Sequence, residues 1–227
     1  MEPTSILPQA SLFLGLIPAL VLLYISIKGY DELYQDKNLY LAFLGGLIAA
    51  LIISFLELRT LDYAHIIPLL WTFIEVLGKT IILNIPKLHE KRETVLYGLA
   101  LGLGFGAMYI PFSIGTIQAP QGGFDTIELV LLIGASLAYV PLHGATGTLI
   151  GYGVYKGKLN KYLLHALLYS LVLPVWIIAT SLLNIPQIQI IALLYVFYLY
   201  YHVTTKYLPQ ILDENQPRKR ANIQEKK

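Results

Sequence analysis

The chain has 227 residues, of which 56% are hydrophobic and only 13% are charged, and its formal net charge is +2. Soluble domains carry about 25% charged residues, so this composition excludes an ordinary soluble domain and indicates a membrane protein. The small net charge argues against a nucleic-acid partner. The sequence contains no cysteine, which excludes disulfide bonds, a thiol nucleophile and a cysteine-ligated metal.

Seven apolar segments follow one another along the chain, each long enough for a helix that crosses the hydrocarbon core, which takes about 20 residues. They cover residues 9–27, 39–56, 63–85, 94–115, 126–155, 162–183 and 188–207. The sequence therefore predicts an all-α, multi-pass protein of the cell membrane. Residues 1–207 are expected to form a seven-transmembrane-helix bundle in contact with the lipid bilayer, and residues 208–227 a polar cytoplasmic tail.

The basic residues between these segments fall almost entirely on one side of the expected membrane. Of the 16 lysines and arginines, 14 lie after the first, third and fifth segments or around the tail, Lys79 lies inside a segment, and only Arg59 lies on the opposite side. Loops rich in lysine and arginine face the cytoplasm. With an odd number of helices, this pattern predicts an N-terminus outside the cell and a cytoplasmic C-terminus.

Four ionisable residues stand inside apolar segments: Glu75, Lys79, His143 and His165. Placing an ionisable group inside a bilayer costs free energy, so such residues usually pair with another group or serve a function. Glu75 and Lys79 are four residues apart, so they share a helix face and can pair. One interpretation is an ion pair that holds the register of the bundle. The other is that Lys79 keeps Glu75 ionised, so that Glu75 can bind a metal or take a proton from water.

The two histidines lie on different segments but are expected at similar depth, close to Glu75. One glutamate and two histidines form a ligand set that catalytic zinc uses, with the fourth position left for water. The sequence therefore predicts a divalent metal site, for instance for zinc, made by Glu75, His143 and His165. The alternative for each histidine is a packing role.

The fourth segment carries Gly98, Gly102 and Gly106 at a strict four-residue spacing. Small residues at this interval allow a second helix to approach closely inside a membrane. The spacing predicts a packing face and says little about a reaction.

Four short runs, in order along the chain, resemble the motifs of PrsW-type intramembrane proteases. Residues 75–79 (EVLGK) resemble the Glu-Glu-x-x-Lys motif, and residues 102–109 (GLGFGAMY) resemble the Gly-Phe-x-x-x-Glu segment. Residues 143–153 (HGATGTLIGYG) resemble the third motif, which contains a histidine, and residues 164–167 (LHAL) resemble the fourth. The sequence departs from the family at Val76 and Tyr109, which stand where the family has glutamates.

This resemblance implies a membrane-embedded site that hydrolyses membrane-anchored peptides near the cytoplasmic face. Glu75 is then a general base or metal ligand and Lys79 its charge partner. The two histidines, His143 and His165, are metal ligands or stabilise the developing oxyanion. Tyr109 is expected beside these side chains.

A second resemblance leads to a different function. The glycine spacing of the fourth segment and the pair His143 and His165 are similar to the anterior-pharynx-defective scaffold subunit of gamma-secretase, over residues 94–205. This likeness implies a non-catalytic scaffold that packs against a partner membrane protein through the glycine face. A small-solute transporter is a third hypothesis, because buried charges and broken helices also serve transport.

Overall fold

The computed structural model describes residues 6–60, 67–116, 126–183 and 189–213. All regular secondary structure within these residues is helical. The elements are α1 (Ile6–Ile27), η2 (Asp31–Leu33), α2 (Asp36–Leu58), α3 (Ile67–Leu83), η3 (Pro86–Leu88), α4 (Glu93–Thr116), α5 (Thr126–Tyr155), α6 (Leu159–Leu183), α7 (Gln189–Tyr207) and α8 (Gln210–Asp213). Each of the seven predicted segments coincides with one long helix, α1 to α7, so the all-α class is confirmed.

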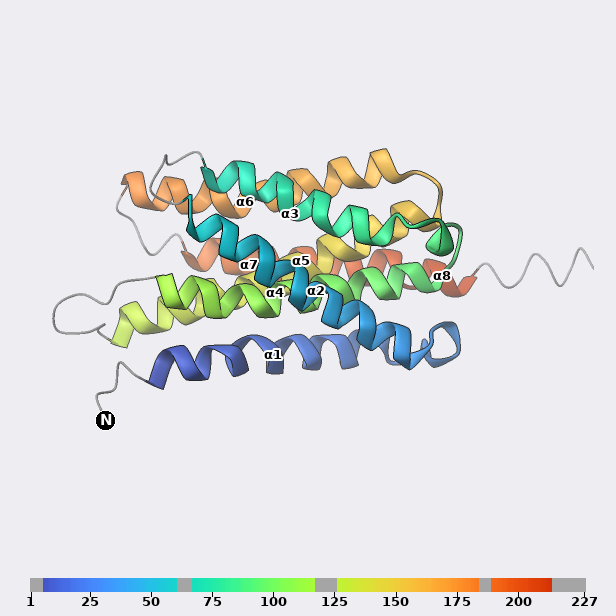
Figure 1. Ribbon diagram of the computed structural model, residues 1–227, viewed down its shortest axis with the longest axis horizontal. Coiled ribbons are helices and arrows are strands. Elements are labelled where there is room, and N and C mark those ends of the chain that lie inside the picture. The colour runs from blue at the N-terminus through green and yellow to red at the C-terminus, as the bar shows by residue number, and fades with distance from the viewer. Residues whose placement is uncertain (1–5, 61–66, 117–125, 184–188, 214–227) are drawn as a thin grey trace, which may run out of the picture.

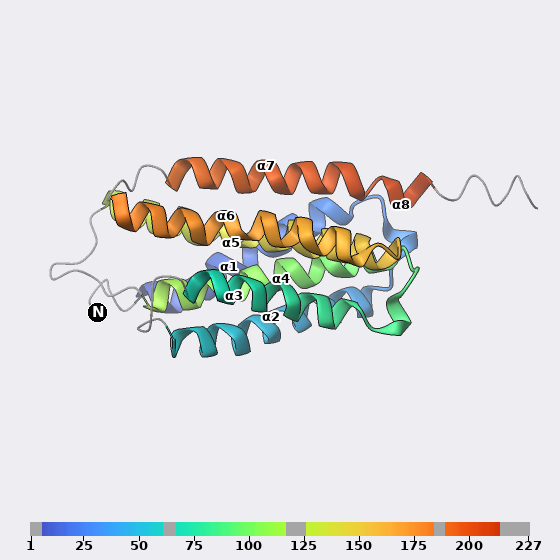
Figure 2. The same ribbon diagram turned by 90° about the horizontal axis from the view of Figure 1, so that it is seen from above.

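The long helices run side by side along the long axis of the molecule, with successive helices pointing in opposite directions (Figures 1 and 2). α4 lies at the centre and packs against α1, α2 and α5, while α3 packs mainly against α6 and α7 against α5. Residues 94–110 of α4 are buried apart from the partly exposed Met108. A helix apolar on every side is expected in such a central position.

Glycines let α4 and α5 approach until their backbones touch. A Cβ atom added to Gly98 would overlap the carbonyl oxygen of Gly147, and one added to Gly102 would overlap that of His143. At Gly106 the added atom would lie 2.6 Å from the carbonyl oxygen of Tyr139. The glycine face of α4 is therefore covered by α5. A scaffold of this fold cannot offer that face to a partner, which corrects the docking route expected from the sequence.

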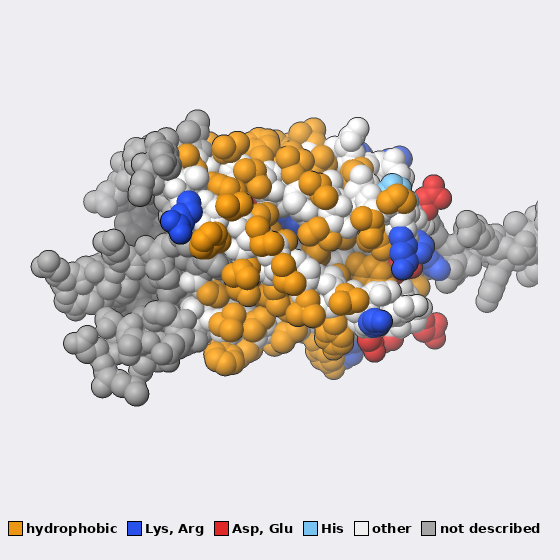
Figure 3. Space-filling model, viewed as in Figure 1, with side chains coloured by type: hydrophobic (Ala, Val, Ile, Leu, Met, Phe, Trp, Pro, Cys, Tyr) orange, Lys and Arg blue, Asp and Glu red, His pale blue; other side chains and the backbone are white. Residues whose placement is uncertain are grey.

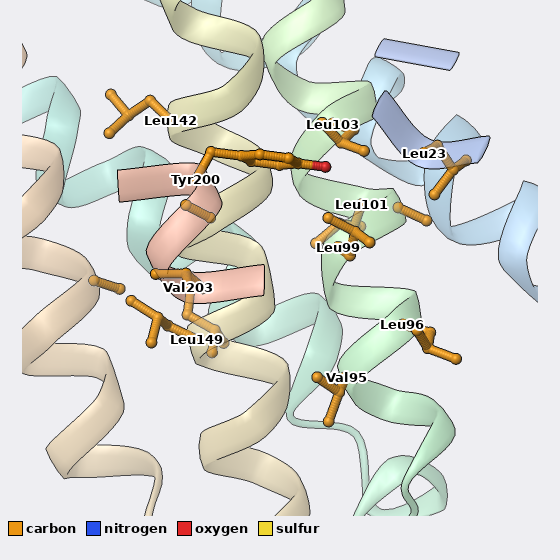
Figure 4. Packing of buried hydrophobic residues seen from close by; sticks show 14 of the residues in the cluster. Leu23, Val95, Leu96, Leu99, Leu101, Leu103, Leu142, Leu149, Tyr200 and Val203 are labelled. Atoms are coloured by element: carbon orange, nitrogen blue, oxygen red, sulfur yellow. The ribbon is translucent and has the colours of Figure 1, made fainter. Parts of the chain in front are cut away.

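The core between α1, α4, α5 and α7 is filled by branched aliphatic side chains, as Figure 4 shows for Leu101, Leu149 and Val203. Tyr200 adds a polar link, because its hydroxyl lies 2.8 Å from the Ser26 hydroxyl and so joins α7 to α1. Past α7, Leu208 and Ile211 are also buried. The bundle therefore extends beyond residue 207, where the tail was predicted to begin.

On the face seen in Figure 3, apolar side chains cover the side of the bundle, and most of the charged side chains in view lie at one end of it. On α2, for example, Leu41, Ile48 and Phe55 are more than half exposed. Among the described residues, two helices, Asp36–Glu57 and Glu93–Pro111, are long and apolar enough to cross a membrane.

Candidate functional site

The centre of the candidate site is Lys79, a fully buried lysine on α3. Its Nζ lies 2.8 Å from His143 Nδ1 and 3.0 Å from Thr146 Oγ1, both on α5. It also lies 5.2 Å from the centre of the Phe105 ring on α4. These contacts compensate for part of the cost of burying the ammonium group. Lys79 therefore links α3 to the α4–α5 pair.

The ring of His143 has one satisfied and one unsatisfied nitrogen. An ammonium group only donates hydrogen bonds, so Nδ1 accepts from Lys79 and the ring proton belongs on Nε2. His143 is 1% exposed, and its Nε2 has no hydrogen-bond partner within the described residues. Few buried polar atoms in folded proteins lack a partner, so this N–H is a candidate for a functional role.

Glu75 lies one helical turn before Lys79 and is 6% exposed. The pairing predicted between these two residues is not formed as a hydrogen bond, because the Lys79 side chain crosses to α5 and donates to acceptors there. Glu75 remains an electrostatic neighbour of Lys79 and of Glu57. Within the part of the chain that the structure describes, no hydrogen bond occupies its carboxyl group.

A second buried carboxyl group, Glu57, comes from the last turn of α2 and was missed in the sequence. The hydroxyl of Tyr109 on α4 donates a hydrogen bond of 2.5 Å to its Oε2. The Tyr109 ring stacks on Tyr139 of α5, with ring centres 4.3 Å apart. Four helices, α2 to α5, thus contribute polar side chains to one buried cluster. Its members are Glu57, Glu75, Lys79, Tyr109, Tyr139 and His143.

One signal in the sequence could have identified Glu57. Gly46, Ala50 and Ser54 are small residues at four-residue spacing on α2, and all three are buried. Glu57 follows three residues after Ser54, on the same helix face. It lies one residue beyond the predicted segment 39–56 and close to Arg59, so a search for ionisable residues inside the segments does not find it.

His165 does not join this cluster. It is only partly buried on α6, its Nδ1 lies 2.7 Å from the Lys161 carbonyl oxygen, and its ring neighbours Tyr162 and Tyr169. At 1.5 Å per residue it lies about 9 Å into α6, whereas His143 lies about 18 Å before the end of α5, so the expected match in depth was wrong.

The predicted metal site is therefore not assembled. Among the described residues, no group of three or more His, Cys, Asp or Glu side chains lies close enough together to hold a metal ion. Glu75 and His143 share one cluster, whereas the third predicted ligand, His165, lies elsewhere on the bundle.

Comparisons of the chain with models of known protein families, with curated proteins and with solved structures found no match. Inferences about function therefore depend on the buried cluster itself. Its side chains offer a buried carboxyl group, Glu75, and an imidazole N–H, His143 Nε2, that has no hydrogen-bond partner within the described residues. A general base and a hydrogen-bond donor are the two kinds of group that hydrolysis of a carbonyl compound requires.

Proposed function

We propose that the chain is a cell-membrane protein in which all seven long helices span the bilayer, with the N-terminus outside and the C-terminus in the cytoplasm. The helices have 17 to 30 residues, which corresponds to about 26–45 Å at 1.5 Å per residue and matches a bilayer core of about 30 Å. The apolar sides of the bundle support this placement, and so does the gathering of charged side chains at one end (Figure 3).

This orientation predicts which positions are reachable from each side. Labels at Asn38, Glu90, Asn160 and the C-terminus should report cytoplasm, while labels at the N-terminus and at Gly122, which lies outside the described residues, should report the exterior. Because the chain contains no cysteine, single cysteines at these positions can be probed in intact cells with a membrane-impermeant thiol reagent. Labelling of position 90 from outside would overturn the orientation.

The function that the buried cluster supports best is hydrolysis of membrane-anchored peptides by a PrsW-like intramembrane peptidase. Glu75 takes a proton from a water molecule, and the water oxygen attacks the peptide carbonyl carbon. His143 Nε2–H donates a hydrogen bond to the oxyanion that forms, and Lys79 fixes the orientation of the His143 ring through Nδ1. The proton held by Glu75 then passes to the leaving nitrogen as the C–N bond breaks.

The observation that carries this proposal is the position of Glu57. The PrsW-type motif has a glutamate where this chain has Tyr109, and a missing acid speaks against activity. Here the Tyr109 hydroxyl binds the Glu57 carboxyl group, and Glu57 is an electrostatic neighbour of Glu75. The second carboxylate is thus supplied by α2 instead of α4. In this proposal Glu57 is the second acidic group of the site, next to Glu75.

A scaffold remains the second candidate, and one observation favours it. Lys79, His143 and Thr146 are buried and hydrogen-bonded to one another, so they join α3 to α5 as structural groups do. Against this interpretation, buried ionic groups can often be replaced by apolar residues without loss of stability. A bundle selected for packing alone has little need for two further buried carboxyl groups.

Cleavage by the purified protein distinguishes the two functions. The full chain is reconstituted into liposomes with a library of synthetic single-span peptides, and products are identified by mass spectrometry in water enriched in oxygen-18. A peptidase produces fragments whose new C-terminal carboxylate carries the heavy isotope. If the folded, reconstituted protein releases no such fragment from the whole library, the peptidase proposal fails and the scaffold is favoured.

A further inference from the structure

A pocket of 460 Å³ lies at the charged end of the bundle, away from the buried cluster. Its walls come from η2, the first turn of α2, the loop around η3 and the first turns of α4. Lys87, Lys91 and Arg92 line it together with two carboxylates, Glu32 and Glu93, so three positive and two negative charges leave a net charge of +1.

The loop that carries the three cations is held in place by its own contacts. His89, between Lys87 and Lys91, has its Nε2 2.9 Å from Asn84 Oδ1, and Thr94 Oγ1 donates to the Leu88 carbonyl oxygen at 2.6 Å. Within the described residues, Arg92 donates one hydrogen bond, to the Ile211 carbonyl oxygen, which leaves most of its guanidinium N–H groups without a partner there. A fixed loop loses little conformational entropy when it binds a ligand.

Lys87 and Lys91 have no carboxylate within ion-pair distance in the described part of the chain. Lysine and arginine side chains are common ligands of phosphate oxygens. The two carboxylates on the same pocket disfavour a multiply charged ligand by repulsion. A single negative charge, such as that of a phosphodiester, matches the net charge of +1 in the pocket.

An apolar path leads from this pocket along the side of the bundle. Asn38 lines the pocket, and Leu41, three residues later on the same helix face, is 55% exposed. Ile48 lies two helical turns after Leu41 on α2 and is 58% exposed. A ligand bound in the pocket can therefore lay hydrocarbon chains along α2, which a soluble phosphate cannot use.

We propose that this pocket binds the headgroup of an anionic phospholipid, with the phosphodiester on Lys87, Lys91 and Arg92 and the acyl chains on the exposed face of α2. The bound lipid anchors the loop before α4 to the membrane surface. This site is independent of the peptidase or scaffold function of the buried cluster.

Native mass spectrometry of the detergent-solubilised full chain tests the site with phosphatidylglycerol as the probe. The wild type should retain a phosphatidylglycerol molecule in preference to phosphatidylcholine. The double change Lys87→Gln and Lys91→Gln should weaken that binding by roughly tenfold or more, because two charge-assisted contacts are lost. Lys28→Gln with Lys37→Gln is the matched control, since both lysines are exposed near the same end and neither lines the pocket.

A third variant tests the charge balance in the opposite direction. Glu32→Gln raises the pocket from a net charge of +1 to +2 and should tighten phosphatidylglycerol binding, which a variant that merely fails to fold cannot do. Equal retention by the pocket variant and the control pair would overturn the proposal. So would equal retention of phosphatidylcholine by the wild type. Displacement of the lipid by inorganic phosphate would assign the pocket to a soluble anion instead.

Discussion

Replacing Glu75 by glutamine is expected, under the proposed peptidase function, to reduce peptide cleavage by at least about a hundredfold, the usual contribution of a general base. The change keeps the volume of the side chain but removes the group that accepts the proton from water. Because no hydrogen bond within the described residues depends on the Glu75 carboxyl group, the fold should be maintained. The rate of fragment release in the liposome assay measures the effect.

Two controls accompany this variant. Glu90→Gln makes the same chemical change at an exposed loop position and should cleave at the wild-type rate. Glu75→Gln leaves Lys79 buried without its electrostatic neighbour, so thermal unfolding in detergent must show that the variant is folded. Combining it with Lys79→Met removes the ammonium as well. A folded Glu75→Gln protein that cleaves at the wild-type rate would show that Glu75 is not the base.

Replacing Gly102 by leucine is expected to destabilise the bundle by about 3 kcal/mol or more, at or above the upper end of the usual cost of overpacking. The added Cβ atom would overlap the carbonyl oxygen of His143, and the next nearest atoms belong to the backbone of His143 and Gly144. Backbone atoms cannot move aside as a flexible side chain can, so α4 and α5 must separate. The unfolding temperature in detergent should fall sharply.

Gly134→Leu is the control for this change. It places the same residue on α5, but among the described residues an added Cβ atom would contact only the Leu193 side chain, 4.0 Å away. The control should unfold close to the wild-type temperature. Equal unfolding temperatures for Gly102→Leu and the wild type would contradict the close packing of α4 on α5.

The sequence predicted the helices well because each is a long apolar run with polar residues at its ends. It also identified Glu75, Lys79 and His143, since an ionisable residue in the middle of such a run is conspicuous. All three are buried in the structure. These predictions depend only on the residues of one helix at a time.

Predictions of contacts between side chains on two different helices were less reliable. Lys79 contacts His143 instead of Glu75 because α3 lies beside α5, and no spacing within α3 reveals its neighbour. His165 could have been excluded by counting residues from the nearest loop, which places it at a shallower depth than His143. Glu57 was missed because it stands one residue beyond the predicted segment 39–56, where charged residues usually contact water.

The most direct test of a two-carboxylate site is the cleavage rate when the second acid is moved from α2 to α4. Glu57→Gln alone should lose most of the activity, because Tyr109 then holds a neutral amide beside Glu75. Adding Tyr109→Glu returns the acid to the position that PrsW-type proteases use, and cleavage should partly recover. Rates are compared in the liposome assay for variants that unfold cooperatively in detergent. A Glu57→Gln protein that cleaves as fast as the wild type would contradict the two-carboxylate site.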